Sequence, residues 1–194
     1  MNAGPANDPR LPLLSGEDAL IAADRIGIDP KYLTQPIWLM LLARPKYAKA
    51  LYAVLTDLLF RSTIPVRLRE LLIMRIGWAT AAEFEWAQHW IVAERAGVNM
   101  DAIVGVRDWQ NCPLFDDAER AGLAAADDVV LSGKVGPSAW ADLRHHFGEA
   151  EVLEITVVIA TWHYVSVLVR SLQVPLDDGM VRWPPDGVAP AAGN

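Results

Sequence analysis

The stretch RLRELLIMRIGWATAAEFEWAQHWIVAERAG, residues 67–97, decides how this chain folds. From Leu71 onward its first half is apolar on nearly every side, which is typical of a helix buried in a core. We expect that helix to span about residues 66–78. Thr80 is followed three residues later by Glu83, the spacing of a capping box, so a second helix is predicted to begin there. It should end near residue 96, because Gly97 is a typical C-terminal stop.

Two polar side chains, Glu85 and His89, share one face of the second predicted helix. Their spacing of four residues places them one turn apart. The other members of that face are small or apolar: Ala82, Val92, Ala93 and Ala96. Burial of a carboxylate and an imidazole is costly unless they pair or take part in chemistry. The pattern favours a functional site, and an ordinary ion pair on a solvated face is the alternative.

The composition indicates one well-packed domain. The chain has 194 residues, of which 53% are hydrophobic. This share is high for a soluble protein and suggests a large core, an oligomer interface or both. The net charge of -7 argues against nucleic acid and anionic membranes as partners. Cys112 is the single cysteine, which excludes an internal disulfide, a CxxC pair and a cysteine metal cluster.

The location of the protein is predicted from two stretches. The N-terminal sequence MNAGPANDPRLPLL lacks the basic start and apolar core of a signal peptide. The most apolar stretch, residues 153–172, contains Glu154, His163 and Arg170, so we do not expect a membrane-spanning helix. We therefore expect a cytoplasmic protein.

The rest of the chain reads as helices separated by turns. Capping residues, prolines and glycines predict helices at about residues 15–25, 35–42, 45–60, 100–106, 116–131, 138–147 and 149–172. The β-branched run at residues 154–169 is too long for one strand and fits a buried helix. The sequence thus predicts an all-α fold. We divide it into an N-terminal arm with a short helix (1–32), a helical domain (33–178) and an extended tail (179–194) that we expect to contribute to a subunit interface.

The pattern RxREL…EFEWAQH…AG, read from residue 67 to 97, resembles the carboxymuconolactone decarboxylase family. That family shares its all-helical fold with the alkylhydroperoxidase D-like proteins. The segment GEAEVLEITVVIATWHYVSVLVRSLQVPLDD, residues 148–178, is similar to the family's last long helix and the turn after it. The resemblance covers about residues 33–178. It implies a helical bundle that assembles into a homo-oligomer, a trimer or a hexamer.

The chain departs from the peroxidase members of that family at both thiol positions. Those members carry a CxxC before the histidine and a glutamate one helix upstream. By position, the glutamate corresponds to Glu70, the histidine to His89, and the cysteines to Ala82 and Glu85. Thiol peroxidase chemistry needs an attacking thiolate and a resolving thiol. The chain instead resembles the cysteine-free decarboxylase members, and we expect no cysteine peroxidase activity.

The resemblance implies a small-molecule substrate and a set of site residues. Decarboxylation of a carboxylated lactone pushes electron density into a conjugated carbonyl, and a carbon atom then accepts a proton. Such a reaction needs no metal and no organic cofactor. The candidate catalytic residues are Glu85, His89 and Glu70. The candidate substrate-binding residues are Arg67, Arg69 and Arg75, any of which could hold a carboxylate, together with Trp86 and His163.

Other interpretations remain open for these residues and for the function. Glu70 could pair locally with Arg67 or Arg69, and Trp86 and His163 could be packing residues. The scaffold could also carry a different cofactor-free reaction on a lactone or enone, since a fold does not fix a function. A third possibility is a non-catalytic oligomer that binds a small molecule, or a diverged peroxidase-like protein without the CxxC.

Overall fold

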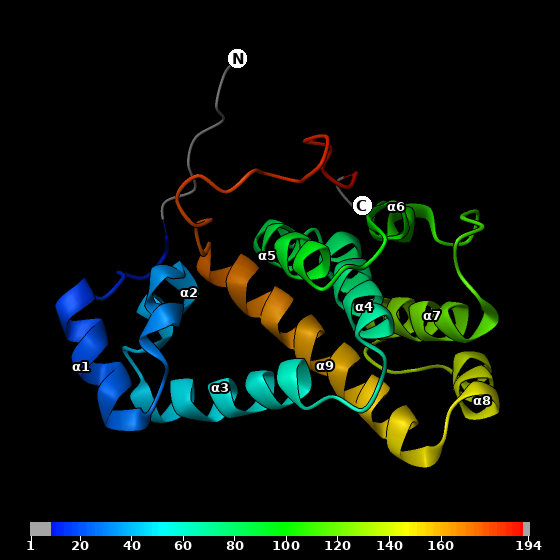
Figure 1. Ribbon diagram of the computed structural model, residues 1–194, viewed down its shortest axis with the longest axis horizontal. Coiled ribbons are helices and arrows are strands. Elements are labelled where there is room, and N and C mark those ends of the chain that lie inside the picture. Colours follow the sequence, from blue (N-terminus) through cyan, green and yellow to red (C-terminus); the bar gives the residue numbers. More distant parts are fainter. Residues whose placement is uncertain (1–8, 192–194) are drawn as a thin grey trace. The chain divides into compact units, whose positions relative to one another are not determined.

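The computed structural model describes residues 9–191 and contains no strand in that range. Its helices are α1 (Gly16–Ile26), α2 (Pro36–Leu41), α3 (Pro45–Phe60), α4 (Val66–Ala79), α5 (Glu83–Arg95), α6 (Met100–Gly105), α7 (Asp117–Ser132), α8 (Pro137–His146) and α9 (Glu149–Leu172) (Figure 1). Short 3₁₀ segments, η1 (Pro30–Thr34) and η2 (Val106–Asp108), accompany them. The all-α prediction is confirmed. Apart from α5, each predicted helix lies within one residue of the observed bounds.

Contacts along the chain define two units. One comprises the described residues up to Arg61 together with Val169–Met180. Within it, the Tyr52 ring packs edge-on against Tyr32 and Trp38, with centroids 5.5 and 5.6 Å away. The other unit comprises Ser62–Leu168 and the C-terminal segment from Val181. All three candidate catalytic residues lie in this second unit. The domain limits predicted from the sequence stay a prediction.

Helix α4 is the central element of the second unit and contacts both α5 and α7. Nine of its fourteen residues are buried, as its all-round apolar pattern predicted. A Cβ atom at Gly77 would lie 3.4 Å from the backbone nitrogen of Trp86, so α4 and α5 approach closely at this glycine. This approach explains how residues of α4 and α5 can form one site.

The turn between α4 and α5 differs from the predicted capping box. Thr80 is the C-terminal cap of α4, and its hydroxyl donates to the Ile76 carbonyl at 2.7 Å. Ala81 then takes a left-handed conformation, with φ at 52°, and α5 begins at Glu83 after Ala82. The capping-box prediction is therefore wrong, because the threonine hydroxyl is used by the preceding helix. The C-terminal stop at Gly97 is confirmed, with φ at 73°.

Part of the predicted tail packs on its own chain. Trp183 is buried in the core that contains Trp86. The Trp86 indole donates to the Pro184 carbonyl at 2.8 Å. Arg182 pairs with Glu83 at 2.7 Å, which gives that glutamate a partner other than Thr80. The segment around Trp183 thus completes the core of the second unit, and a contribution of the tail to a subunit interface stays a prediction.

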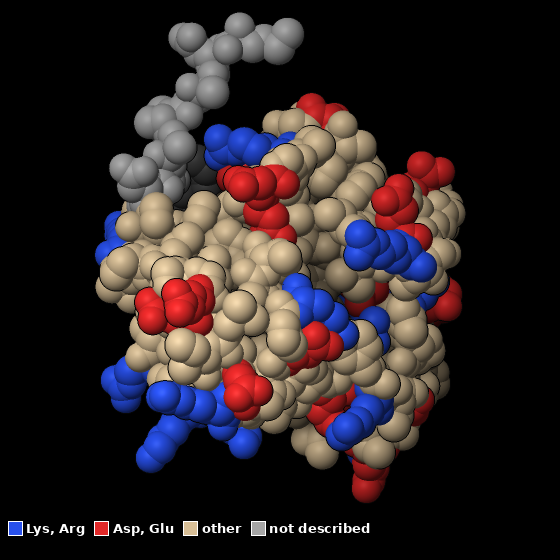
Figure 2. Space-filling model, turned by 60° about the vertical axis from the view of Figure 1, so that its left-hand side comes forward, with Lys and Arg blue, Asp and Glu red and all other residues tan. Residues whose placement is uncertain are grey.

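Helix α9 is, among the described residues, the one helix long and apolar enough to cross a membrane by length and composition. Of its most apolar window, 44% is buried inside the chain. The core helix of a soluble protein meets the same criterion, and Trp162 of α9 is bonded inside the second unit. Acidic and basic side chains both occur on the face shown in Figure 2, separated by uncharged areas. A cytoplasmic location stays a prediction.

Candidate functional site

Helices α4, α5 and α9 bring four buried polar side chains together in the second unit. Glu70 comes from α4, Glu85 and His89 from α5, and Trp162 from α9. Their exposed fractions are 0%, 5%, 7% and 2%, respectively. The structure therefore places the three candidate catalytic residues in one buried cluster, hereafter the acid/base cluster, and adds Trp162 to them.

Both carboxylate oxygens of Glu70 accept hydrogen bonds. Arg69 Nε donates to Oε1 at 2.9 Å, and His89 Nδ1 lies 2.8 Å from Oε2. Burial by itself raises the pKa of the Glu70 carboxyl. The electrostatic attraction of His89 and its hydrogen bond, together with the pairing with Arg69, outweigh burial and hold that pKa below its usual value. Glu70 is therefore an ionised carboxylate at neutral pH, of use as a fixed negative charge rather than as a proton donor.

Both ring nitrogens of His89 have partners. Opposite Glu70, the Trp162 indole Nε1 donates to His89 Nε2 at 3.0 Å. The two rings are also packed edge to face, with centroids 5.4 Å apart. The burial of Trp162 could have been predicted from the sequence, because Ile155, Ile159 and Trp162 follow helical spacing on one face of α9, but its bond to His89 could not.

Glu85 is the carboxyl group of the cluster that has no hydrogen bond within the described chain. Its Oε2 lies 4.0 Å from His89 Nε2, one helical turn away. Burial raises the pKa of Glu85 to about 7, against a smaller opposing effect of His89. At neutral pH this carboxyl group is therefore present in both its acid and its base form, as a proton-transfer group requires.

A buried hydroxyl lies one turn beyond Trp162 on α9. Ser166 is fully buried, and its Oγ has no hydrogen-bond partner in the described chain. An unpaired buried hydroxyl costs about 1–3 kcal/mol. The periodicity of α9 did not predict this unpaired hydroxyl, because a single serine between valines is also typical of ordinary helix packing.

Two of the predicted substrate-binding arginines form ion pairs outside the acid/base cluster. Arg67 Nε pairs with Glu119 at 2.6 Å, and Arg75 Nε pairs with Asp127 at 2.5 Å. These ion pairs join α4 to α7 and are not part of the acid/base cluster. Arg69 is the predicted arginine that the structure does bring to the cluster, through Glu70.

The two remaining predicted binding residues, Trp86 and His163, form no hydrogen bond to Glu70, Glu85 or His89 in the described chain. Trp86 is fully buried in the core beside Trp183, and its indole nitrogen donates to the Pro184 carbonyl of the tail. His163 follows Trp162 on α9 and is half-buried, and no hydrogen bond joins it to Glu70 or His89. A substrate contact at either residue stays a prediction.

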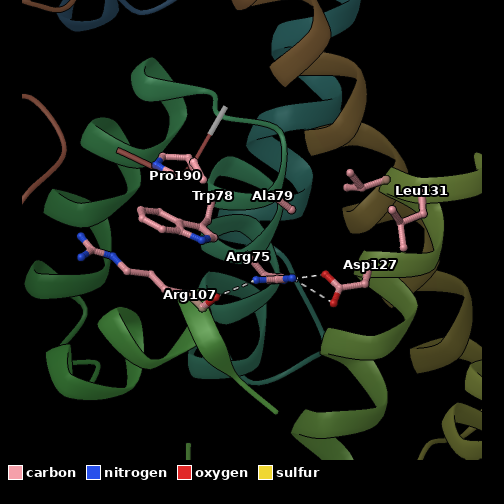
Figure 3. A pocket seen from close by; sticks show the side chains of 9 residues that line it. Arg75, Trp78, Ala79, Arg107, Asp127, Leu131 and Pro190 are labelled. Carbon is pink, nitrogen blue, oxygen red and sulfur yellow. Dashed lines mark hydrogen bonds and ion pairs between the residues drawn. The ribbon is translucent and has the colours of Figure 1, made fainter. Parts of the chain in front are cut away.

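A separate cavity of about 330 Å³ opens beside α4 and α7 (Figure 3). Its lining includes the Arg75–Asp127 ion pair, the Trp78 ring, Arg107 and the exposed Leu131. Arg75 also donates to the backbone carbonyls of Val106 and Arg107. Arg75 and Asp127 of this cavity thus satisfy each other, whereas the buried Arg107 Nε has no hydrogen-bond partner in the described chain. Glu70, Glu85 and His89 do not line the cavity.

Among residues 9–191, no group of three or more His, Cys, Asp and Glu side chains has an arrangement that could hold a metal ion. In the acid/base cluster, both ring nitrogens of His89 are already hydrogen-bonded, Nδ1 to Glu70 and Nε2 to Trp162. Its evident chemical capacity is proton exchange at Glu85.

Comparisons with known proteins show which sequences and folds this chain resembles. The sequence model described as the carboxymuconolactone decarboxylase family matches residues 45–128, which include Glu70, Glu85 and His89. The uncharacterized protein YnjA of Escherichia coli is 31% identical over 94 residues, which are 48% of this chain and 50% of YnjA. The chain thus matches about half the length of that relative.

Solved structures show the same fold at low sequence identity. The debrominase Bmp8, solved as a cysteine-to-alanine variant with 2,3,4-tribromopyrrole, is similar with a TM-score of 0.74 and 19% identity, over 88% of this chain and 95% of Bmp8. A peroxidase-related protein from Ralstonia eutropha JMP134, described as an alkylhydroperoxidase AhpD core, has a TM-score of 0.69 and 18% identity, over 96% of this chain and all of that one. Residues 45–128 thus match the carboxymuconolactone decarboxylase family, and the chain has the alkylhydroperoxidase D-like fold.

Proposed function

We propose that this protein catalyses a cofactor-free acid/base reaction, decarboxylation or isomerisation, on a small lactone or carboxylated ring-cleavage product. One observation carries the proposal: Glu85 is a buried carboxyl group with a pKa of about 7, 4.0 Å from an imidazole. A general acid works best when its pKa lies near the working pH. The match of residues 45–128 to the carboxymuconolactone decarboxylase family supports the substrate class.

The chemical step needs one proton from the protein. In a carboxylated lactone, the bond between the ring carbon and its carboxylate breaks, and carbon dioxide leaves. The electron pair moves into the conjugated carbonyl, which gives a dienolate. Protonated Glu85 then donates its proton to carbon, the electron pair forms the new C–H bond, and the glutamate is left as a carboxylate that regains a proton from water.

The other members of the cluster support Glu85. The ionised Glu70, held by Arg69, keeps a negative charge beside His89. The imidazole in turn lies against the Glu85 carboxyl and favours its charged form after the proton has left. An isomerisation would use the same group in both directions, first as base and then as acid.

A thiol-dependent reaction has less support. The two thiol positions of the peroxidase members are occupied by Ala82 and Glu85. Cys112 is half-buried and lies after η2, outside the acid/base cluster. The similarity to the debrominase Bmp8 is therefore one of fold, and we do not propose a shared reaction.

The test is turnover of a panel of carboxylated five-membered lactones, with evolved carbon dioxide as the readout. Wild-type protein should release carbon dioxide, and Glu85→Gln should lose about 10²–10⁴-fold in rate, the typical contribution of a positioned acid or base. Glu94→Gln, which removes an exposed carboxylate from the same helix, is the matched control and should keep full activity. Equal rates for Glu85→Gln and wild type would contradict the proposal.

A further inference from the structure

Ser166 carries a buried hydroxyl that its own helix does not use. Elsewhere in this chain a helical hydroxyl donates to the carbonyl four residues earlier, as Thr156 of α9 does to Val152 at 2.7 Å. Ser166 is 0% exposed, and its Oγ has no hydrogen-bond partner among the described residues. Buried polar groups are nearly always hydrogen-bonded, so this hydroxyl calls for a partner from outside the chain.

Contacts at two levels give the direction of α9 beside α4 and α5. Near the start of α9, the Glu154 carboxylate accepts from the Thr63 backbone N–H at 3.0 Å. Eight residues later, Trp162 is bonded to His89. His89 is bonded in turn to Glu70, seven residues after Thr63. The partners advance together, so α9 runs parallel to α4. It runs antiparallel to α5, because α5 returns along α4 after a short turn.

This direction places Ser166 and Glu85 at the same level of the second unit. Ser166 lies four residues after Trp162 on α9, and Glu85 lies four residues before His89 on α5. Four residues are about one helical turn, so each side chain lies one turn beyond the bond between His89 and Trp162, on the same side of it. Glu85 is 5% exposed and, like Ser166, is buried without a hydrogen bond in the described chain. Two unpaired polar groups thus share one buried level.

We propose that the Ser166 hydroxyl is the hydrogen-bond donor for the carbonyl oxygen of the substrate, in the same buried site where Glu85 supplies the proton. This rests on the proposed function, in which an electron pair moves into a conjugated carbonyl and its oxygen needs a donor. When carbon dioxide leaves, that oxygen becomes negative, and the Ser166 O–H donates to it and keeps its own proton. Glu85 then protonates carbon, and the oxygen becomes a carbonyl again.

The unpaired hydroxyl of the free protein is consistent with this role. A donor that is fixed before the reaction needs no rearrangement when charge develops, and its hydrogen bond is stronger where bulk water is excluded. The hydroxyl lowers stability until a substrate accepts from it, and such a conflict between stability and activity is common at functional sites. Both side chains are almost completely enclosed, so only a small ligand can reach them, after a local opening of the surrounding side chains.

Binding of tetronate tests the donor without turnover. Tetronate is a five-membered lactone that is an enolate at neutral pH, so its charged oxygen resembles the one formed in the reaction. Calorimetry at pH 6, where Glu85 is mostly protonated, should show about 10- to 100-fold weaker binding to Ser166→Ala than to wild type, as is typical for loss of a hydrogen bond to a charged group. Ser171→Ala, at an exposed position of the same helix, should bind tetronate as wild type does.

Two further measurements locate the donor and test its catalytic role. A bound anion favours the neutral form of a nearby carboxyl, so saturating tetronate should raise the pKa of Glu85 above 7 in carbon-13 NMR titrations of wild-type protein. Once a substrate is identified, Ser166→Ala should lower kcat by about 10²–10³-fold, the typical contribution of one such donor, and should change KM less.

The outcomes separate the donor from the proposed function. Absence of tetronate binding in wild type, equal affinity in Ser166→Ala, or an unmoved Glu85 transition overturns the assignment of Ser166. If tetronate binding depends on Ser166 and no carboxylated lactone is turned over, the proposed reaction fails and the binding site stands. If lactones are turned over and Ser166→Ala keeps full kcat and tetronate affinity, the donor fails and the proposed reaction stands.

Discussion

Replacement of Glu85 by glutamine should stabilise the protein at alkaline pH while it abolishes activity. The carboxyl has an ordinary pKa of 4.5 when the chain is unfolded and of about 7 in the folded protein. The folded state therefore binds the proton more tightly than the unfolded state. Its contribution to stability is fully present below pH 4.5 and is lost as the pH rises through 7.

The size of the effect follows from the difference between those two values. One pKa unit corresponds to about 1.4 kcal/mol, so the ionised Glu85 should cost the folded state about 3 kcal/mol at pH 8 and about 1 kcal/mol at pH 5. Glutamine has a similar shape and no charge. The free energy of unfolding of Glu85→Gln should thus exceed that of wild type by about 3 kcal/mol at pH 8, or about 6–12 °C in melting temperature for a chain of this size.

Thermal and urea unfolding at pH 5 and pH 8, at one fixed protein concentration, measure this difference. Glu94→Gln removes an exposed carboxylate from the same helix and should change stability by less than about 0.5 kcal/mol at either pH. A Glu85→Gln protein that is less stable than wild type at pH 8, or equally stable at both pH values, would refute the reasoning. It would mean that Glu85 is an ordinary structural residue.

Four further predictions concern the stability of the cluster, the buried serine, the cysteine and the assembly of the protein. Glu70→Gln should lower the free energy of unfolding by about 3–5 kcal/mol in urea titrations, because it removes the buried charge that pairs with both Arg69 and His89; an unchanged midpoint would show that these pairs are dispensable. Ser166→Ala should raise the melting temperature, because it removes a buried hydroxyl without a partner, whereas the exposed Ser171→Ala should not; a lower melting temperature for Ser166→Ala would contradict the assignment. Cys112→Ser should keep full turnover of any lactone substrate and of added hydroperoxide, and a large loss in either assay would point to a thiol mechanism. Light scattering at micromolar concentration should report a homo-oligomer, as the resemblance to the family implies, and a monomeric mass would oppose that prediction.

Most of the fold was predictable because its signals are local. Proline at the start of α3, the acidic first turn of α7 and the all-round apolar pattern of α4 each act within a few residues. The one error at a helix start, before α5, came from a threonine whose hydroxyl had two possible uses. Spacing alone could not show that Thr80 bonds backward to Ile76 rather than forward to the next helix.

The acid/base cluster was predictable only along one helix. The four-residue spacing of Glu85 and His89 is visible in the sequence, and the family pattern adds Glu70. The partners of these groups come from contacts between distant segments, which no local pattern encodes. Trp162 is 73 residues away from His89, and Arg67 and Arg75 find acids 52 residues away on α7. The arginines therefore could not be sorted by sequence into those that face the cluster and those that join helices.

The most direct test of the account is the titration of Glu85 itself. Carbon-13 NMR of side-chain carboxyl groups in wild-type protein, with the spectrum of Glu85→Gln used to identify the Glu85 signal, follows its protonation from pH 4 to pH 9. We predict a single transition near pH 7, displaced from the ordinary value by burial. A transition near pH 4.5 would show that Glu85 is a solvated carboxylate, and it would contradict the assignment of this residue as the proton donor.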